Sequence, residues 1–239
     1  MNGPEVNAAH QRSEELARGL DAVQARIGAA CRAAGRDPAD LTLVVVTKTY
    51  PASDVRRLAG LGVVDLGENR DQEAAGKAGE TEDLALRWHL IGRLQTNKAR
   101  SVVRYAHLVH SLDRPALADA LGRAAVGAGR VLPCLLQVSL DDDPDRGGAP
   151  VAEVPALADR IARTEGLRLD GVMAVAPLGA DPRAGFERLA RVAGRLRCLH
   201  PGATVVSAGM SGDLEHAVAC GATHLRVGSA ILGARPQQG

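Results

Sequence analysis

Short apolar runs alternate with amphipathic segments along this chain of 239 residues, and the alternation constrains the fold more than any other feature. The apolar runs cover residues 41–46, 62–67, 86–91, 107–110, 131–140, 169–176, 204–207 and 223–227. Such runs are typical of strands buried on both faces of a parallel sheet. About eight strand–helix units predict a closed (β/α)₈ barrel of the TIM type. An open doubly wound sheet fits less well, because the units continue to the end of the chain.

One helix is predicted before the first strand. From Ser13 the apolar residues Leu16, Leu20, Val23 and Ile27 recur every three or four positions, which indicates an amphipathic helix that ends near Gly35. We therefore expect a single domain over residues 13–235, in which the barrel carries an extra N-terminal helix. Residues 1–12 and 236–239 are expected to be flexible termini. Three later helices are expected to have the N-caps Asp113, Asp181 and Ser211.

Composition narrows the class of protein. Hydrophobic residues make up 46% of the chain but aromatic residues only 2%, so alanine, valine and leucine must fill the core. The net charge of +1 gives no electrostatic reason to expect binding to nucleic acid or to an anionic membrane. Four cysteines without a C-x-x-C pair favour a reducing compartment over disulfides or a zinc site. With no signal peptide and no apolar run of membrane length, we expect a cytoplasmic protein without a metal.

Lys48 directly follows the first predicted strand, and Pro51 ends the element. In barrels the chemistry lies at the carboxyl ends of the strands. A partly desolvated lysine there favours the neutral amine that forms a Schiff base. The alternative is a lysine whose amine reaches out to water, which is the commoner case for a lysine at a strand end.

Small residues follow the seventh and eighth predicted strands, at 207–211 and 228–229. Such loops let backbone amides approach an anion, and barrels commonly hold phosphate at this place. Glycine and serine also serve as ordinary turn residues, and Asp213 and Glu215 count slightly against a bound anion. Together the two loops predict a phosphate site.

Other polar residues are expected at the same rim. Arg226 lies on the eighth strand, Asn69 follows the second, and His89 lies on the third. Taken separately, Arg226 is explained by an ion pair and His89 by a structural role. Together with Lys48 and the phosphate loops, they match the needs of pyridoxal phosphate, whose aldehyde takes a lysine and whose ring nitrogen takes one partner.

The motifs resemble those of the pyridoxal phosphate homeostasis proteins, which are similar to the N-terminal barrel of bacterial alanine racemase. The matching motifs are V-V-V-T-K-T-Y-P around Lys48, G-E-N at 67–69, W-H-L-I-G-R-L-Q-T-N-K at 88–98, G-V-M-A-V at 171–175, S-A-G-M-S at 207–211 and R-V-G-S-A-I-L-G-A-R at 226–235. They span nearly the whole chain in order.

The resemblance implies a site for pyridoxal 5′-phosphate, bound covalently as a Schiff base on Lys48, with Arg226 donating to the pyridine nitrogen. The residues implied to hold the phosphate are Ser207, Ser211, Gly228 and Ser229. Those implied to surround the ring are Asn69, His89 and Met210. Two positions depart from the family pattern: Arg93, where many relatives have a smaller residue or proline, and Arg146 in the loop 141–150, where relatives often have lysine. Arg93 is expected to change what enters above the cofactor, and Arg146 to preserve an anion contact.

The function implied by the resemblance is control of the intracellular supply of pyridoxal phosphate without significant catalysis. We expect no racemase-type C-terminal β domain, because the chain ends at Gly239. An arginine at the ring nitrogen also weakens the electron sink. The protein is expected to be a monomer, and pyridoxal-phosphate-dependent apo-enzymes are its expected partners. A weak single-domain amino-acid racemase is the second hypothesis, and a barrel lyase or isomerase with a Schiff-base lysine and no cofactor is the third.

Overall fold

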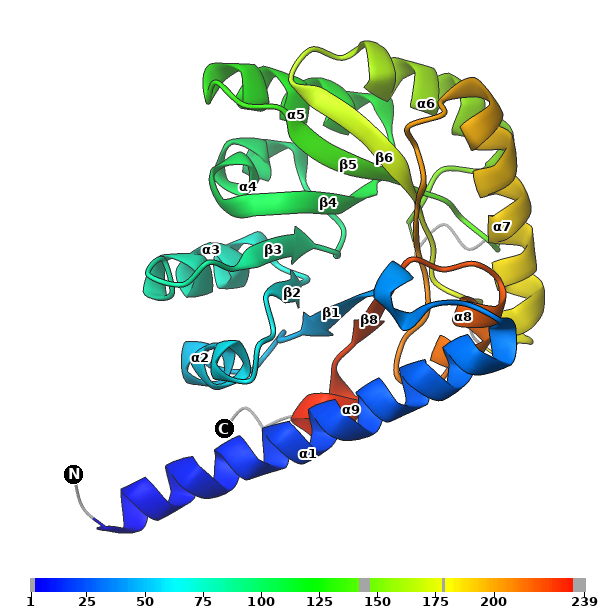
Figure 1. Ribbon diagram of the computed structural model, residues 1–239. Helices are drawn as coiled ribbons and strands as arrows, with labels where there is room; N and C mark the ends of the chain where they lie inside the picture. The colour runs from blue at the N-terminus through cyan, green and yellow to red at the C-terminus, as the bar shows by residue number, and fades with distance from the viewer. Residues whose placement is uncertain (1–2, 142–146, 178, 234–239) are drawn as a thin grey trace.

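The protein folds into a closed barrel of parallel strands, as the sequence predicts (Figure 1). The structure is a computed structural model that describes residues 3–141, 147–177 and 179–233. Its strands are β1 (Thr42–Val46), β2 (Asp65–Glu68), β3 (Arg87–Leu90), β4 (Ala106–Leu112), β5 (Leu132–Gln137), β6 (Leu167–Met173), β7 (Val205–Ser207) and β8 (His224–Val227). Each strand pairs with the next in the chain, and β8 pairs with β1 to close the barrel. The open doubly wound sheet is therefore excluded.

Helices surround the barrel on the outside (Figure 1). They are α1 (Gly3–Ala34), α2 (Ala52–Gly60), α3 (Asp71–Glu80), α4 (Ala99–Tyr105), α5 (Pro115–Gly127), α6 (Val154–Arg163), α7 (Pro182–Leu199), α8 (Leu214–Ala219) and α9 (Ser229–Leu232). The right-handed crossovers that such parallel strands require bring every strand's carboxyl end to the same face of the barrel. The loops after the strands therefore meet at that face.

The extra N-terminal helix begins earlier than predicted. Helix α1 starts at Gly3 instead of Ser13 and lies along α8 and α9 (Figure 1). Contacts of Arg12 explain the difference: its guanidinium pairs with Asp54 of α2 at 2.8 Å and donates to the carbonyl of Leu232 at 3.1 Å. The periodicity of apolar residues misses this anchor, because the anchor is charged. Residues 236–239 lie outside the described residues.

The predicted helix caps have mixed outcomes. Asp181 caps α7, since its side chain accepts a hydrogen bond from the amide of Arg183. The predictions for Asp113 and Ser211 are wrong: the N-cap residues of α5 and α8 are Arg114 and Asp213. Asp113 instead accepts from Arg114 at 2.6 Å, and Ser211 turns its hydroxyl toward α9. In the predicted loop 141–150, residues 142–146, including Arg146, lie outside the described residues.

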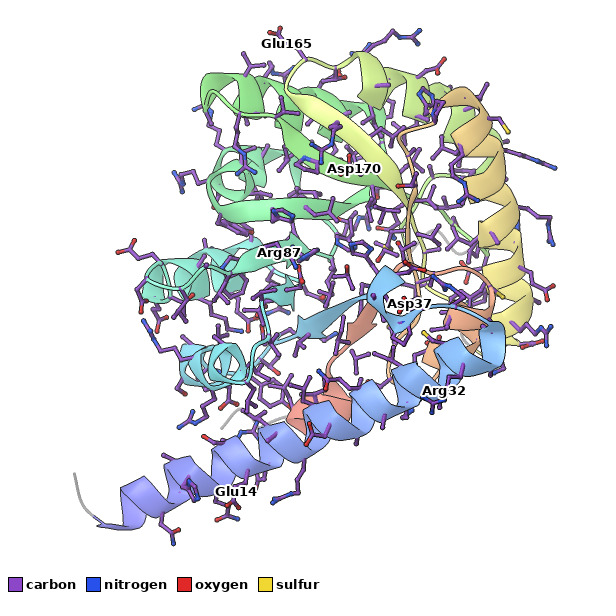
Figure 2. All side chains as sticks on the ribbon, viewed as in Figure 1. Glu14, Arg32, Asp37, Arg87, Glu165 and Asp170 are labelled. Carbon is purple, nitrogen blue, oxygen red and sulfur yellow. The ribbon has the colours of Figure 1, made fainter. Side chains whose placement is uncertain are left out.

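The core has two parts. The larger part lies between the sheet and the helices and consists mainly of leucine, valine and alanine, as the low aromatic content predicts. The smaller part lies inside the barrel, where Leu108, Leu135 and Met173 pack together. The interior also holds the polar side chains of His89, His110 and Arg226, all nearly completely buried. Figure 2 shows side chains filling the barrel, so the interior is no channel. This polar layer lies directly beneath the candidate site.

Candidate functional site

A pocket of about 420 Å³ opens at the carboxyl ends of the strands. Of the predicted site residues, seven line it: Lys48, Asn69, Met210, Ser211, Arg226, Gly228 and Ser229. The lining also includes Val46, Tyr50, Ile91, Val175 and Gly212. The elements that supply these residues are separated by most of the chain, and barrel closure brings them together. A pocket therefore exists where the sequence predicts the site.

Lys48 lies in a tight turn that follows β1. The amide of Tyr50 donates to the carbonyl of Thr47 at 3.0 Å, and Thr49 has a φ of 72°. A positive φ at a threonine is strained, and such strain persists where the surroundings fix the backbone. Here Glu73 accepts from the Thr49 amide at 2.5 Å. The turn thus directs the partly buried Lys48 into the pocket.

A buried ion network between β2 and α3 supports this turn. The amine of Lys77 binds Glu68 at 2.6 Å, Glu73 at 2.7 Å and the carbonyl of Thr47 at 2.7 Å. Burial of Glu68 raises the pKa of its carboxyl despite the hydrogen bonds from Lys77 and Thr47. The sequence analysis did not find this network, because only folding brings α3 beside the Lys48 turn. The signal in the sequence was the oppositely charged pair Glu73 and Lys77, which are four residues apart on a helix.

The two small-residue loops form a cradle of hydrogen-bond donors. Within the described part of the chain, the backbone amides of Ser211, Gly212 and Ser229 have no acceptor. The hydroxyls of Ser211 and Ser229 lie 3.3 Å apart, and the amide of Ala230 donates to Ser211 at 3.4 Å. Backbone amides without acceptors beside a pocket suit an anion with several oxygens.

Close packing favours glycine at position 228. A Cβ atom there would lie 3.0 Å from the carbonyl oxygen and 3.3 Å from the Cβ of Val46. Gly92 has a similar role after β3, since a Cβ would lie 2.3 Å from the carbonyl oxygen of Asn69. Both glycines keep neighbouring strand ends close together. They define the width of the pocket rather than contacting a ligand through side chains.

Arg226 brings a buried cation to the floor of the pocket. Its Nη2 donates to the carbonyl of Ala174 at 2.9 Å and its Nη1 donates to the hydroxyl of Ser207. No carboxylate among the described residues forms an ion pair with it. Burial lowers its pKa to about 10, so the guanidinium is still charged at neutral pH. Its Nε has no acceptor within the described chain and remains available for a ligand.

His89 and Ser207 do not line the pocket, so their predicted contacts with a cofactor stay predictions. Side chains on one face of a strand recur every second residue, and the inward residue of this strand that reaches the pocket is Ile91. His89 therefore lies one layer lower in the barrel. There its Nε2 bonds Asp65 at 2.9 Å and its Nδ1 bonds His110 at 2.9 Å. Ser207 bonds Arg226 and His110 in the same layer.

The two tyrosines have different positions. Tyr50 lines the pocket, which the sequence analysis did not predict, and its hydroxyl donates to the carbonyl of Gly233 at 2.9 Å. Tyr105 does not line it and donates to Asp71 at 3.2 Å. Burial raises the pKa of Tyr105 far above its ordinary value. Neither hydroxyl is thus placed as a ready proton acceptor.

A basic groove of about 800 Å³ adjoins the pocket and shares Asn69 with it. Its cations are Arg70, Arg93, Lys98 and Arg114. The departure from the family pattern at Arg93 therefore concerns this groove and not the lining of the pocket itself.

The charges of the pocket select the class of ligand. Lys48 and Arg226 are its cations, and no carboxylate occurs among the described residues that line it. The chain has three lysines; Lys77 is buried in its ion network and Lys98 lies in the groove, so the pocket's amine is Lys48. The arrangement can hold an anion in the cradle, an aldehyde at Lys48 and a hydrogen-bond acceptor at Arg226. These are the groups of pyridoxal phosphate, and the residues fit it.

Comparisons with known proteins agree with this geometry. The family described as "Alanine racemase, N-terminal domain" matches residues 19–236. The pyridoxal phosphate homeostasis protein of Mycobacterium tuberculosis is 42% identical, with 97% of each chain covered. That of Escherichia coli is 35% identical, covering 92% of this chain and 97% of the relative. The structure of PipY from Synechococcus elongatus with PLP bound has a TM-score of 0.78 and 37% identity, covering 88% of this chain and 100% of PipY.

The described residues contain neither a membrane-spanning helix nor a cluster of metal ligands. No helix there has the length and apolar character needed to cross a membrane. No group of three or more histidine, cysteine, aspartate or glutamate side chains is arranged to hold a metal ion.

Proposed function

The chain belongs to the pyridoxal phosphate homeostasis protein family, and from this premise we propose that it holds pyridoxal 5′-phosphate covalently on Lys48 and controls its supply without significant catalysis. One observation carries the proposal: a single pocket combines Lys48, the donor cradle and Arg226, and no carboxylate among its described lining residues opposes an anion. When bound, the cofactor supplies an aldehyde that reacts with amines and a pyridine ring that withdraws electrons.

The amine of Lys48 would hold the cofactor covalently through its aldehyde. The strained Thr49 turn and the ion network of Lys77 keep this amine directed into the pocket. The amides of Ser211, Gly212 and Ser229 would hold the phosphate, and Met210 and Asn69 would hold the ring, since all of them line the pocket. Arg226, held by two other hydrogen bonds, would donate to the ring nitrogen.

We propose a non-catalytic role because the described residues that line the pocket offer no second proton acceptor beside Lys48. Racemisation requires a proton to be removed on one face of the α-carbon and returned on the other. Besides Lys48, the titratable groups in the described lining are Tyr50, whose hydroxyl donates to Gly233, and the cationic Arg226. An arginine at the ring nitrogen also cannot protonate the ring, so carbanions gain little stabilisation.

Borohydride reduction followed by peptide mapping tests the covalent site. We expect the pyridoxyl mass on the Lys48 peptide and no reduced adduct in Lys48→Arg, whereas the matched variant Lys98→Arg should be labelled normally. Label on Lys77 or Lys98 in the wild-type protein would contradict the assignment.

Exchange of the α-proton of alanine in heavy water tests the absence of catalysis. We expect no more exchange than free pyridoxal phosphate gives. Exchange well above that level, and lost in Lys48→Arg, would instead favour the weak racemase. The proposed role in the cytoplasm is to keep the cofactor bound until pyridoxal-phosphate-dependent apo-enzymes take it, with the protein acting as a monomer. Transfer to a purified apo-enzyme, and sedimentation of the loaded protein, test these points.

A further inference from the structure

A continuous chain of hydrogen bonds crosses the barrel beneath the pocket. It begins at Arg226 Nη1, which donates to Ser207 Oγ, and continues to His110 Nδ1 at 2.9 Å. From His110 Nε2 it passes to His89 Nδ1 at 2.9 Å. It then ends at Asp65, whose Oδ1 lies 2.9 Å from His89 Nε2. These five side chains come from β8, β7, β4, β3 and β2 and are all nearly completely buried.

The two ends of the chain fix the direction of every bond in it. Arginine can only donate, and an ionised carboxylate can only accept. Burial disfavours the charge on Asp65, but the hydrogen bonds from His89 and Arg87 outweigh it and lower its pKa, so the carboxylate is ionised at neutral pH. His89 must then donate from Nε2 to Asp65.

The middle of the chain follows from the ends. A neutral His89 that donates from Nε2 accepts at Nδ1, so His110 donates to it from Nε2. A neutral His110 then accepts at Nδ1 from the hydroxyl of Ser207, which itself accepts from Arg226. Four bonds thus use four hydrogens, all directed from Arg226 toward Asp65. A further proton on either histidine would place two hydrogens in one bond.

The surroundings of His110 agree with a neutral ring. Burial, with a smaller contribution from Arg226, holds the pKa of His110 well below its ordinary range. Near its Asp65 end the chain of hydrogen bonds faces His107, His224 and Arg87. Arg87, which is labelled in Figure 2, pairs with Asp65. No described carboxylate pairs with Arg226 directly. The polarised chain therefore links the buried cation to a carboxylate on the far side of the barrel.

We propose that Asp65, His89, His110 and Ser207 are positioning residues for Arg226: they hold its guanidinium as a fixed donor to the ring nitrogen of the cofactor. The functional part of this inference rests on the proposed binding of pyridoxal phosphate. The chain adds a requirement that the pocket residues alone do not reveal, since Asp65 acts on the pocket through three intervening side chains. Cofactor retention should therefore depend on residues that never touch the cofactor.

The tautomers of the histidines test the chain without any cofactor. Long-range ¹H–¹⁵N spectra of the labelled apo-protein at pH 7 should show His89 and His110 neutral and protonated at Nε2, with assignments from His89→Gln and His110→Gln. Protonation at Nδ1 of either ring, or a doubly protonated ring, would overturn the inference. This result is independent of whether the protein binds pyridoxal phosphate.

Release of the cofactor tests the positioning role. Ser207→Ala and Asp65→Leu should each release bound pyridoxal phosphate about tenfold faster, as expected when one hydrogen bond to a charged group is weakened. The matched control Arg87→Ala removes the outer partner of Asp65 and should change the rate less than twofold. Ser207→Ala leaves Asp65 in place, so His89 of this variant should remain protonated at Nε2. The test with Ser207→Ala therefore still applies if Asp65→Leu fails to fold. Normal release from Ser207→Ala would overturn the positioning role.

Discussion

Backbone amides in the pocket cradle lack acceptors, whereas the polar side chains below and behind the pocket are almost all paired. Within the described residues, the buried side-chain atoms without a partner are Glu68 Oε2 and Ser111 Oγ. The cradle donors are near solvent and lose little when no ligand is bound, but buried groups lose a full hydrogen bond if left unpaired. The comparison teaches that the pocket is prepared for a ligand, and that the layers supporting it are complete without one.

The largest expected effect comes from breaking the buried ion network of Lys77 behind the pocket. Lys77→Ala leaves Glu68 buried without its cation, which should lower the free energy of unfolding by about 3–5 kcal/mol. Urea unfolding measures this. The double variant Lys77→Met, Glu68→Leu removes both charges and should recover most of the loss. A stable Lys77→Ala protein would show that the ion network does not support the Lys48 turn.

The second-largest expected effect is a loss of folding stability in acid, caused by the buried His224 inside the barrel. Burial lowers the pKa of His224 to about 4. The unfolded chain therefore binds a proton between pH 6.5 and 4 that the folded protein does not, so stability is full above this window and falls as pH decreases through it. His224→Gln should remove about 3 kcal/mol of the loss measured by unfolding at pH 7 and pH 4. His216→Gln, at an exposed position on α8, is the control and should leave the loss unchanged.

Added bulk in the cradle should weaken the binding of pyridoxal phosphate and leave the hydrogen-bonded side chains below the pocket unchanged. Gly228→Val places side-chain atoms against Val46 and narrows the pocket, so we expect affinity for pyridoxal phosphate to fall about a hundredfold. Gly202→Val adds the same bulk at a glycine with open space around it and should bind normally. Fluorescence titration measures both. Normal binding by Gly228→Val would place the phosphate site elsewhere.

The smallest expected effect is the loss of one hydroxyl from the cradle. Ser211→Ala should weaken binding by about 1 kcal/mol, as for one neutral hydrogen bond, because the amides remain. Ser53→Ala, at an exposed position on α2, should have no effect. A much larger loss in Ser211→Ala would mean that side chains, and not the backbone, hold the phosphate.

Much of this protein could be predicted from its sequence, because the signals are local. Short apolar runs define the strands and period-3.6 patterns the helices, and the order of the strands in a barrel follows from the order in the chain. The rule that barrel chemistry lies at the carboxyl ends of strands then places Lys48, Arg226 and Gly228 in one pocket, as the structure shows.

Only the tertiary structure decided at which height in the barrel each inward side chain lies. His89 and Ile91 point the same way along one strand, and the stagger of neighbouring strands puts Ile91 in the pocket and His89 below it. Pairing across the barrel is equally invisible in the sequence: Asp65, His110 and Ser207 lie on separate strands, and no spacing relates them. Hydrogen bonds act over about 3 Å, so partners far apart in the chain are known only when the closed sheet fixes their register.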